Sequence, residues 1–151
     1  MVLGRHGGAL PKFALPIRLG VGAVLGSGQQ WLPWIHLDDL VRMILFAVDH
    51  PNATGAINAV APDPVTNETF TRALARSLHR PAYLRISDRL IRAALGELSG
   101  IFLAGQNVWP QKALSLGFLF RWPSLDDALA DIYGHTAHQR RRRHILLRSD
   151  W

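Results

Sequence analysis

The 151-residue chain is 48% hydrophobic with a formal net charge of +6, a composition typical of one folded domain with a buried core. It contains no cysteine, which excludes disulfides, zinc–thiolate sites and thiol catalysis. It also lacks an uncharged apolar run that could cross a bilayer and an apolar signal-peptide core at its start, so we expect a cytoplasmic protein without a membrane partner.

The first half of the chain alternates glycine-rich and apolar segments. The expected elements are the end of a strand at 1–4, a helix at 9–19, a glycine-rich loop at 20–28, an aromatic extended stretch at 29–36, and a helix that ends near Pro51. Asp38 and Asp39 are expected to cap that last helix, because carboxylates favour the free N–H groups of a first turn.

The second half is predicted to be mostly helical. The expected elements are a buried strand at 56–62, a helix at 66–81 capped by Thr66 or Asn67, a short strand at 82–87, helices at 88–95, 98–103 and 110–116, an extended stretch at 118–123, and a capped helix at 124–133. A parallel sheet needs neighbouring strands and covered faces, and the strand at 56–62 has no evident partner. This mismatch indicates that the chain belongs to something larger.

Most of the basic charge lies in residues 136–151, where five arginines oppose one aspartate and leave a net charge of only +2 for residues 1–135. Such a terminal run is typical of a solvated tail, so 135–151 is expected to be disordered and nucleic acid is disfavoured as a partner. Two alternatives stay open. The chain could be a small basic nucleic-acid- or anion-binding protein acting through Arg140–Arg143, or the tail could be read-through sequence.

The glycines of residues 20–28 loosely resemble a dinucleotide-binding fingerprint. That fingerprint requires a strand before the glycines and a helix that starts within them, so that the pyrophosphate meets the helix N-terminus. Here a helix is expected before the glycines and an extended stretch after them. We therefore interpret the segment as a flexible loop beside a pocket.

His36, Asp38 and Asp39 form a polar cluster where a strand is expected to meet a helix. Their side chains should diverge at such a junction, no second histidine follows at ligand spacing, and no G-x-S-x-G serine is present, so neither a metal site nor a catalytic triad is predicted. The first interpretation is a capped helix with a junction histidine. The functional alternative places Trp31, Trp34 and His36 at the mouth of a cleft.

Four stretches together resemble the epimerase-like branch of the extended short-chain dehydrogenase/reductase family, also called the NAD-dependent epimerase/dehydratase family. They are VLGRHGGAL, LGVGAVLGSGQQWLPWIHLDDLV, GAINAVAPDPVTNETFTRALARSLHRPA and VWPQKALSLGFLFRWPSLDDAL, and the last is similar to the branch's small C-terminal domain of unknown function. The resemblance extends from Met1 to about Tyr133. It implies an α/β fold: the back half of a Rossmann-type NAD(P)-binding fold over residues 1–62, with a mostly helical substrate-side lobe over 63–134.

The sequence lacks the family's G-x-x-G-x-x-G loop and its Tyr-x-x-x-Lys, since neither Tyr83 nor Tyr133 has a lysine four residues later. The resemblance thus implies the C-terminal substrate-binding portion of an NAD(P)-dependent oxidoreductase, inactive alone and not expected to bind NAD or NADP alone. Its implied partners are an unknown small-molecule substrate and a separate Rossmann half. No catalytic residue is expected, and the expected substrate-pocket residues are Gln30, Trp31, Trp34 and His36.

Overall fold

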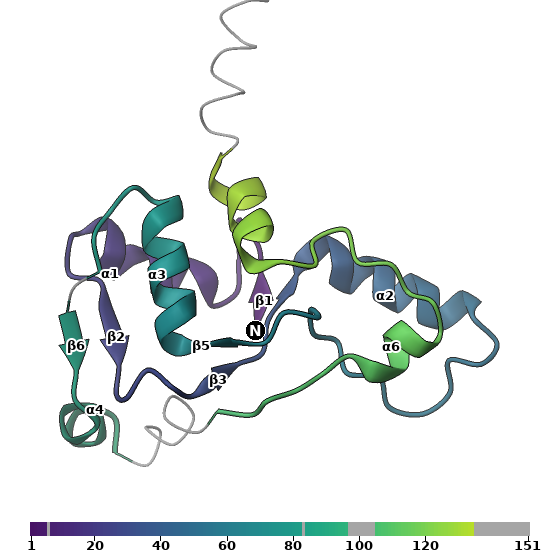
Figure 1. The fold of residues 1–151 in the computed structure, drawn as a ribbon, viewed down its shortest axis with the longest axis horizontal. Helices are drawn as coiled ribbons and strands as arrows, with labels where there is room; N and C mark the ends of the chain where they lie inside the picture. The colour runs from purple at the N-terminus through teal and green to yellow at the C-terminus, as the bar shows by residue number, and fades with distance from the viewer. Residues whose placement is uncertain (6, 83, 97–104, 135–151) are drawn as a thin grey trace, which may run out of the picture.

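The structure, a computed structural model, describes residues 1–5, 7–82, 84–96 and 105–134 (Figure 1). Its elements are β1 (Val2–Leu3), α1 (Leu10–Arg18), β2 (Ala23–Leu25), β3 (Trp31–Leu32), β4 (Ile35–His36), α2 (Leu37–Asp49), β5 (Val65–Thr66), α3 (Asn67–Ser77), β6 (Leu84–Ile86), α4 (Asp88–Leu95) and α6 (Gln111–Ser115), followed by a helix at 125–134. The predicted α/β class with few strands is confirmed. The helix expected at 98–103 and the basic tail lie outside the described residues.

The strands form three two-stranded ladders within the described part of the chain. β1 pairs with β4 and β2 with β6, both in parallel, whereas β3 and β5 pair antiparallel. The predicted loop at 20–28 is therefore wrong in part, because its middle forms β2. The loop residues around it supply the left-handed turns, with positive φ angles at Gly20, Gly26 and Gly28.

The buried strand predicted at 56–62 is wrong. These residues belong to no ladder, and most of their side chains are exposed or half-buried. One backbone hydrogen bond links them to the segment before β4, from the Ala61 N–H to the Trp34 carbonyl oxygen at 2.6 Å. An apolar run becomes a strand only where it forms a ladder of backbone hydrogen bonds with a neighbour, and this single bond does not make a ladder.

Side-chain caps begin four of the described helices and explain why they start where they do; at the helix at 125–134, Ser124 Oγ accepts from the Asp127 N–H. Thr66 Oγ1 accepts a hydrogen bond from the Thr69 N–H, and Ser87 Oγ accepts from the Leu90 N–H. In α2 the cap is His36, whose Nδ1 accepts from the Asp38 N–H at 3.1 Å. The prediction for Asp38 and Asp39 is therefore right in part: both lie in the first turn of α2, but the N-cap is His36.

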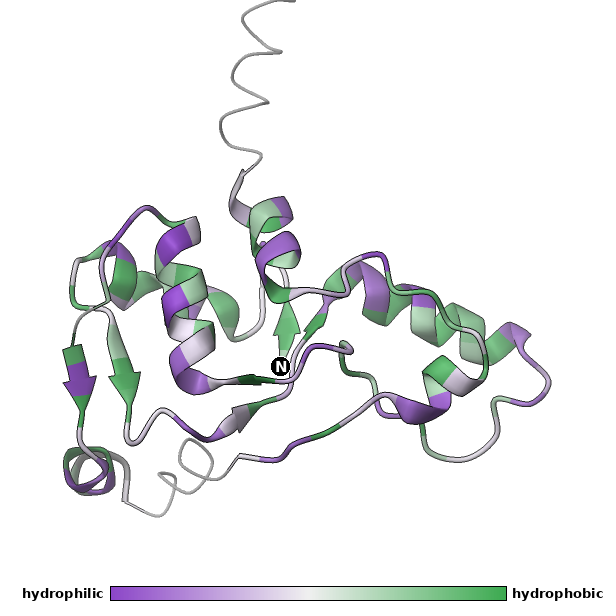
Figure 2. Cartoon of the chain, in the orientation of Figure 1, coloured by the Kyte–Doolittle hydropathy of each residue, from purple (hydrophilic) through white to green (hydrophobic). Residues whose placement is uncertain are grey.

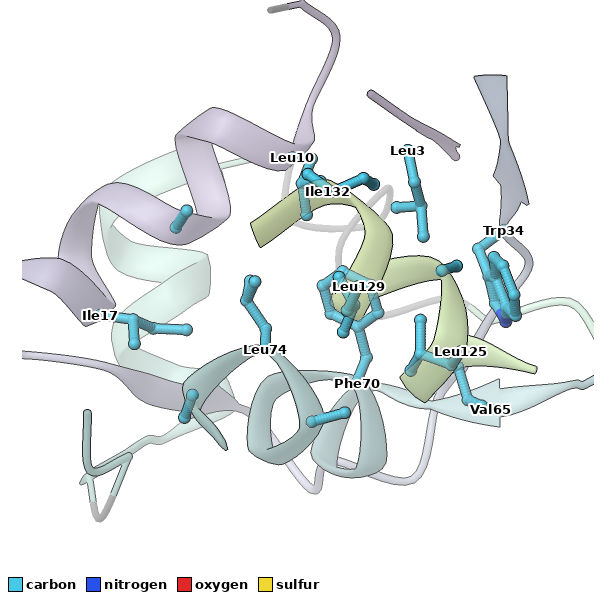
Figure 3. Packing of buried hydrophobic residues seen from close by; sticks show 14 of the residues in the cluster. Leu3, Leu10, Ile17, Trp34, Val65, Phe70, Leu74, Leu125, Leu129 and Ile132 are labelled. Atoms are coloured by element: carbon cyan, nitrogen blue, oxygen red, sulfur yellow. The ribbon is translucent and has the colours of Figure 1, made fainter. Parts of the chain in front are cut away.

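The main core lies between α1, α3 and the helix at 125–134, with β1 and the Trp34 segment along one side (Figure 3). Phe70 is fully buried and meets Phe13 edge-on, with ring centroids 5.9 Å apart. Residues from both sides of the predicted division at 62/63 share this cluster. A smaller cluster of Ile35, Met43, Ala113 and Phe118 lies between α2 and α6.

Candidate functional site

A cleft of about 450 Å³ opens where the parallel strands β1 and β4 end. Its lining comes from the turn after β1, the start of α2 and the helix at 125–134, and comprises Gly4, Arg5, Gly7, His36, Leu37, Asp38, Asp131 and Ile132. In open α/β sheets ligands bind outside the carboxyl ends of the strands. We therefore take this cleft as the candidate site.

His36 is the central polar side chain of the cleft wall and is only 4% exposed. Since its Nδ1 accepts the Asp38 N–H, the neutral ring carries its hydrogen on Nε2. Nε2 faces the Asp131 carboxylate at 3.5 Å, which is an ion-pair distance but not a formed hydrogen bond. A buried polar atom without a hydrogen-bond partner is uncommon in folded proteins and marks this wall as a place for a polar ligand atom.

Trp122 packs against His36 from behind the cleft lining, to which it does not itself belong. Its ring centroid lies 5.3 Å from that of His36, and its indole Nε1 is the other buried side-chain nitrogen without a partner among the described residues. Arg5 also lines the cleft; it is exposed and donates a hydrogen bond to the Asp131 carbonyl oxygen at 3.1 Å. The cleft thus combines an arginine, a histidine and carboxylates around two backbone glycines.

The capping role of His36 can be separated from its role in the cleft. We expect His36→Ala to lower the free energy of unfolding by about 1 kcal/mol more than His36→Asn, because asparagine restores an N-cap acceptor while both variants remove the imidazole. Urea denaturation followed by circular dichroism measures the difference. Equal stability of the two variants would contradict the cap.

Asp39 is fully buried. The sequence pattern predicts it only as a helix cap and does not predict its buried hydrogen bonds. One carboxylate oxygen accepts from the Arg121 N–H and from Arg42 Nη1, and the other accepts from the Trp122 N–H, each at 2.8 Å. It therefore holds the segment that carries Trp122 against the first turn of α2. The available sequence signal was its spacing, since Asp39 lies four residues before the buried Met43 on one helix face.

The structure places the four predicted substrate-pocket residues apart. His36 lines the cleft, whereas Trp34 is 1% exposed in the main core and donates its indole N–H to the Asp63 carbonyl oxygen. Gln30 donates its side-chain amide to the Leu25 carbonyl oxygen, and Trp31 lies at 37% exposure in β3. None of these three lines the cleft, and a substrate pocket formed by all four stays a prediction.

A second hollow, of about 520 Å³, lies against α3 and β6 and is lined by Arg72, Arg76, Arg80 and Arg85. Carboxylates already engage three of these guanidinium groups: Glu68 pairs with Arg72 and Arg85, and Asp126 pairs with Arg76. This hollow is therefore a weaker candidate for a ligand than the cleft, where the buried His36 Nε2 makes no hydrogen bond.

Tyr133 does not have the properties of an acid/base tyrosine. Burial raises the pKa of its phenol above the ordinary value, and the nearby Arg18, 5.5 Å from the ring centroid, lowers it only in part. A catalytic tyrosine needs the opposite direction. Tyr83 lies outside the described residues.

The described residues also limit which cofactors and metal ions this part of the chain could hold. They contain no group of three or more His, Asp or Glu side chains that could hold a metal ion, and no helix among them could span a membrane. Around residues 20–28 the order is α1, glycines, β2, the reverse of the strand–turn–helix order that cradles a pyrophosphate. The turn after β1 does lead into α1, but Pro11 removes one N–H from the first turn of that helix.

Comparison with known proteins gives two family matches along the chain. Residues 3–60 match the NAD dependent epimerase/dehydratase family, and residues 88–132 match a domain of unknown function, DUF1731. Among curated proteins, the epimerase family protein SERP0438 of Staphylococcus epidermidis is 45% identical over 132 residues, and the epimerase family protein SDR39U1 of Mus musculus is 41% identical over 133 residues. Each match covers 87% of this chain but only 44% and 45% of the relative.

Solved structures give the same result. Human SDR39U1 (isoform 2), crystallised with NADPH, superposes with a TM-score of 0.83 at 36% identity over 88% of this chain and 45% of the human one. The nucleoside-diphosphate sugar epimerase of Corynebacterium glutamicum superposes with a TM-score of 0.68 at 28% identity, over 93% of this chain and 27% of that one. The chain thus spans less than half the length of these relatives. The sequence resemblance is confirmed.

Proposed function

We propose that this chain, which belongs to the NAD dependent epimerase/dehydratase family, supplies the C-terminal, substrate-binding portion of an NAD(P)-dependent oxidoreductase. The observation that carries the proposal is the cleft at the carboxyl ends of β1 and β4, in which the buried His36 Nε2 makes no hydrogen bond and lies 3.5 Å from the Asp131 carboxylate. The similarity to a human protein crystallised with NADPH supports a nicotinamide cofactor as the other component of the site.

The described residues do not fit a complete dinucleotide. They offer a cleft wall with Gly4, Gly7 and His36, which has room for a flat ring, but no glycine-rich strand–turn–helix that would hold the pyrophosphate. NAD(P) would supply hydride transfer when bound, and the residues that hold its phosphates are expected in the Rossmann half. His36 and Arg5 would contribute a donor and a positive charge to a small polar substrate.

The proposal predicts that the 151-residue chain alone does not bind the cofactor. Isothermal titration calorimetry with NADPH, and separately with NADH, should give no heat of binding up to about 1 mM. A single chain in which a Rossmann half precedes Met1 should bind one of them with a dissociation constant on the order of 10 µM. Tight binding by the short chain, or none by the long one, would contradict the proposal.

A further inference from the structure

Four arginine side chains surround the hollow of about 520 Å³ between α3 and β6. They are Arg72, Arg76, Arg80 and Arg85. No described residue of the lining is acidic, and its other described members are apolar, among them the buried Val24 and Ala75. We call this feature the arginine hollow. It shares no described lining residue with the cleft, and Figure 2 shows hydrophilic residues on α3 and in β6, at the end of the molecule opposite α2.

The end of α3 explains why three of these arginines meet. Arg72 and Arg76 are four residues apart and therefore share one face of the helix. After the helix, His79 adopts a positive φ of 53°, and the Arg80 N–H donates to the Ala75 carbonyl oxygen at 3.0 Å. The chain thus folds back at the helix end and brings Arg80 to the same hollow. Cations gathered there face the negative end of the helix dipole, which stabilises them.

Two of the four arginines already have structural roles. Arg85 donates to the Ser27 carbonyl oxygen at 2.6 Å and to Glu68 Oε2 at 3.1 Å, and so ties β6 to the turn after β2. Glu68 is 17% exposed and also pairs with Arg72 at 2.6 Å. These two guanidinium groups are therefore neutralised in part by one sheltered carboxylate.

The other two guanidinium groups are held less firmly. Arg76 pairs with Asp126 at 3.1 Å, but the two side chains are 64% and 73% exposed, and water screens such a pair. The Arg80 guanidinium forms no ion pair with any carboxylate of the described residues. Four arginines against two paired carboxylates leave a net charge of +2 at the hollow.

The chemistry of the lining selects a class of ligand. A guanidinium binds phosphate through two parallel N–H···O bonds, and two such groups can neutralise a phosphate dianion. The buried apolar lining offers contact to a carbon body beside that phosphate. Nucleic acid fits less well, because no described lining residue is an aromatic on which a base could stack.

We propose that the arginine hollow binds the phosphate group of a small organic phosphate, held by Arg76 and Arg80. The site is separate from the cleft, and the proposal does not depend on the proposed function. Arg72 and Arg85 contribute positive charge and keep their contacts with Glu68.

Isothermal titration calorimetry at low ionic strength tests the site, with phenyl phosphate as the probe. Every protein carries glutamine at residues 140–143, so that the basic tail cannot supply the signal. The probe should bind with a dissociation constant on the order of 0.1–1 mM, and phenol, which lacks the phosphate, should not bind measurably. Arg80→Gln and Arg76→Gln should each weaken binding at least fivefold. Arg89→Gln is the matched control, since Arg89 is exposed on α4 outside the lining, and it should change binding less than twofold.

The carboxylate that competes for Arg76 gives a second readout in the opposite direction. Asp126→Asn frees the guanidinium and should tighten phenyl phosphate binding at least twofold. Asp127→Asn changes the net charge equally at a neighbouring exposed residue and should leave the affinity unaltered.

Three results would overturn the proposal, provided that circular dichroism shows each variant folded. The first is an absence of binding by the unsubstituted hollow. The second is an equal loss in Arg80→Gln and Arg89→Gln, or an equal gain in Asp126→Asn and Asp127→Asn, since either indicates only diffuse attraction by the net charge. The third is an oligothymidylate that binds more tightly than phenyl phosphate and is lost in Arg80→Gln, which would make nucleic acid the occupant.

Discussion

Replacing Asp39 with alanine is expected to lower the free energy of unfolding by about 3–5 kcal/mol, the range found when one member of a buried charged network is removed. The side chain is fully buried, and its two oxygens accept the N–H groups of Arg121 and Trp122. Without the carboxylate these two backbone donors lose their partners inside the protein, and each unmade hydrogen bond carries its own desolvation cost. Urea denaturation monitored by circular dichroism measures the loss.

Neighbouring substitutions separate the possible causes. Asp38→Ala, on an exposed side chain in the same helical turn, should cost about 0.5 kcal/mol through the helix dipole alone. Arg42→Ala should cost less than about 1 kcal/mol, because the arginine is 44% exposed and its ion pair is screened by water. If Arg42→Ala were as damaging as Asp39→Ala, the ion pair and not the backbone hydrogen bonds would hold the two segments together.

The effect of Asp39 should reach the cleft. The segment that it holds carries Trp122, whose ring packs beside His36. We therefore expect Asp39→Asn, which keeps one acceptor oxygen, to fold but to place Trp122 less firmly than the natural side chain does.

Local signals in the sequence were sufficient to predict most of the helices. The polar residues Thr66 and Ser87 precede apolar residues at helical spacing, and a cap of this kind depends on neighbours within four residues. Such patterns need no knowledge of the rest of the fold. The end of α3 was placed too late, at 81, because His79 adopts a positive φ of 53° that no pattern had indicated.

Contacts between residues far apart in the sequence could not be predicted in the same way. The cleft joins Arg5 and Asp131, which are 126 positions apart, and Asp39 meets backbone donors 82 and 83 positions away. No spacing rule links such residues. The resemblance to a family indicated the region of the site through His36, but the structure was needed to find the other residues of its wall.

Trp34 illustrates how an interrupted strand directs two nearby side chains to different places. Residues two apart in a strand share a face, which favours Trp34 and His36 in one pocket. In the structure β3 ends at Leu32 and β4 begins at Ile35, so the alternation is interrupted at Pro33 and Trp34. Trp34 turns into the main core while His36 reaches the cleft.

Trp34→Ala is accordingly expected to cost about 3–5 kcal/mol of unfolding free energy, as for other large aromatic side chains removed from a core. Trp34→Phe should cost about 1–2 kcal/mol, since it keeps most of the packing but leaves the Asp63 carbonyl oxygen without its 2.8 Å hydrogen bond. Trp109→Ala is the matched control, because that tryptophan is 47% exposed, and it should cost less than about 1 kcal/mol.

The comparison also distinguishes a core role of Trp34 from a role in binding. A core residue changes the denaturation midpoint and leaves the ligand affinity of the folded fraction unaltered, whereas a pocket residue does the reverse. Measured in a single-chain form with the Rossmann half, Trp34→Phe should keep NADPH affinity within about twofold, because the indole contacts the core and not the cleft lining. A phenylalanine variant with unchanged stability and a tenfold loss of affinity would instead place Trp34 in the binding site.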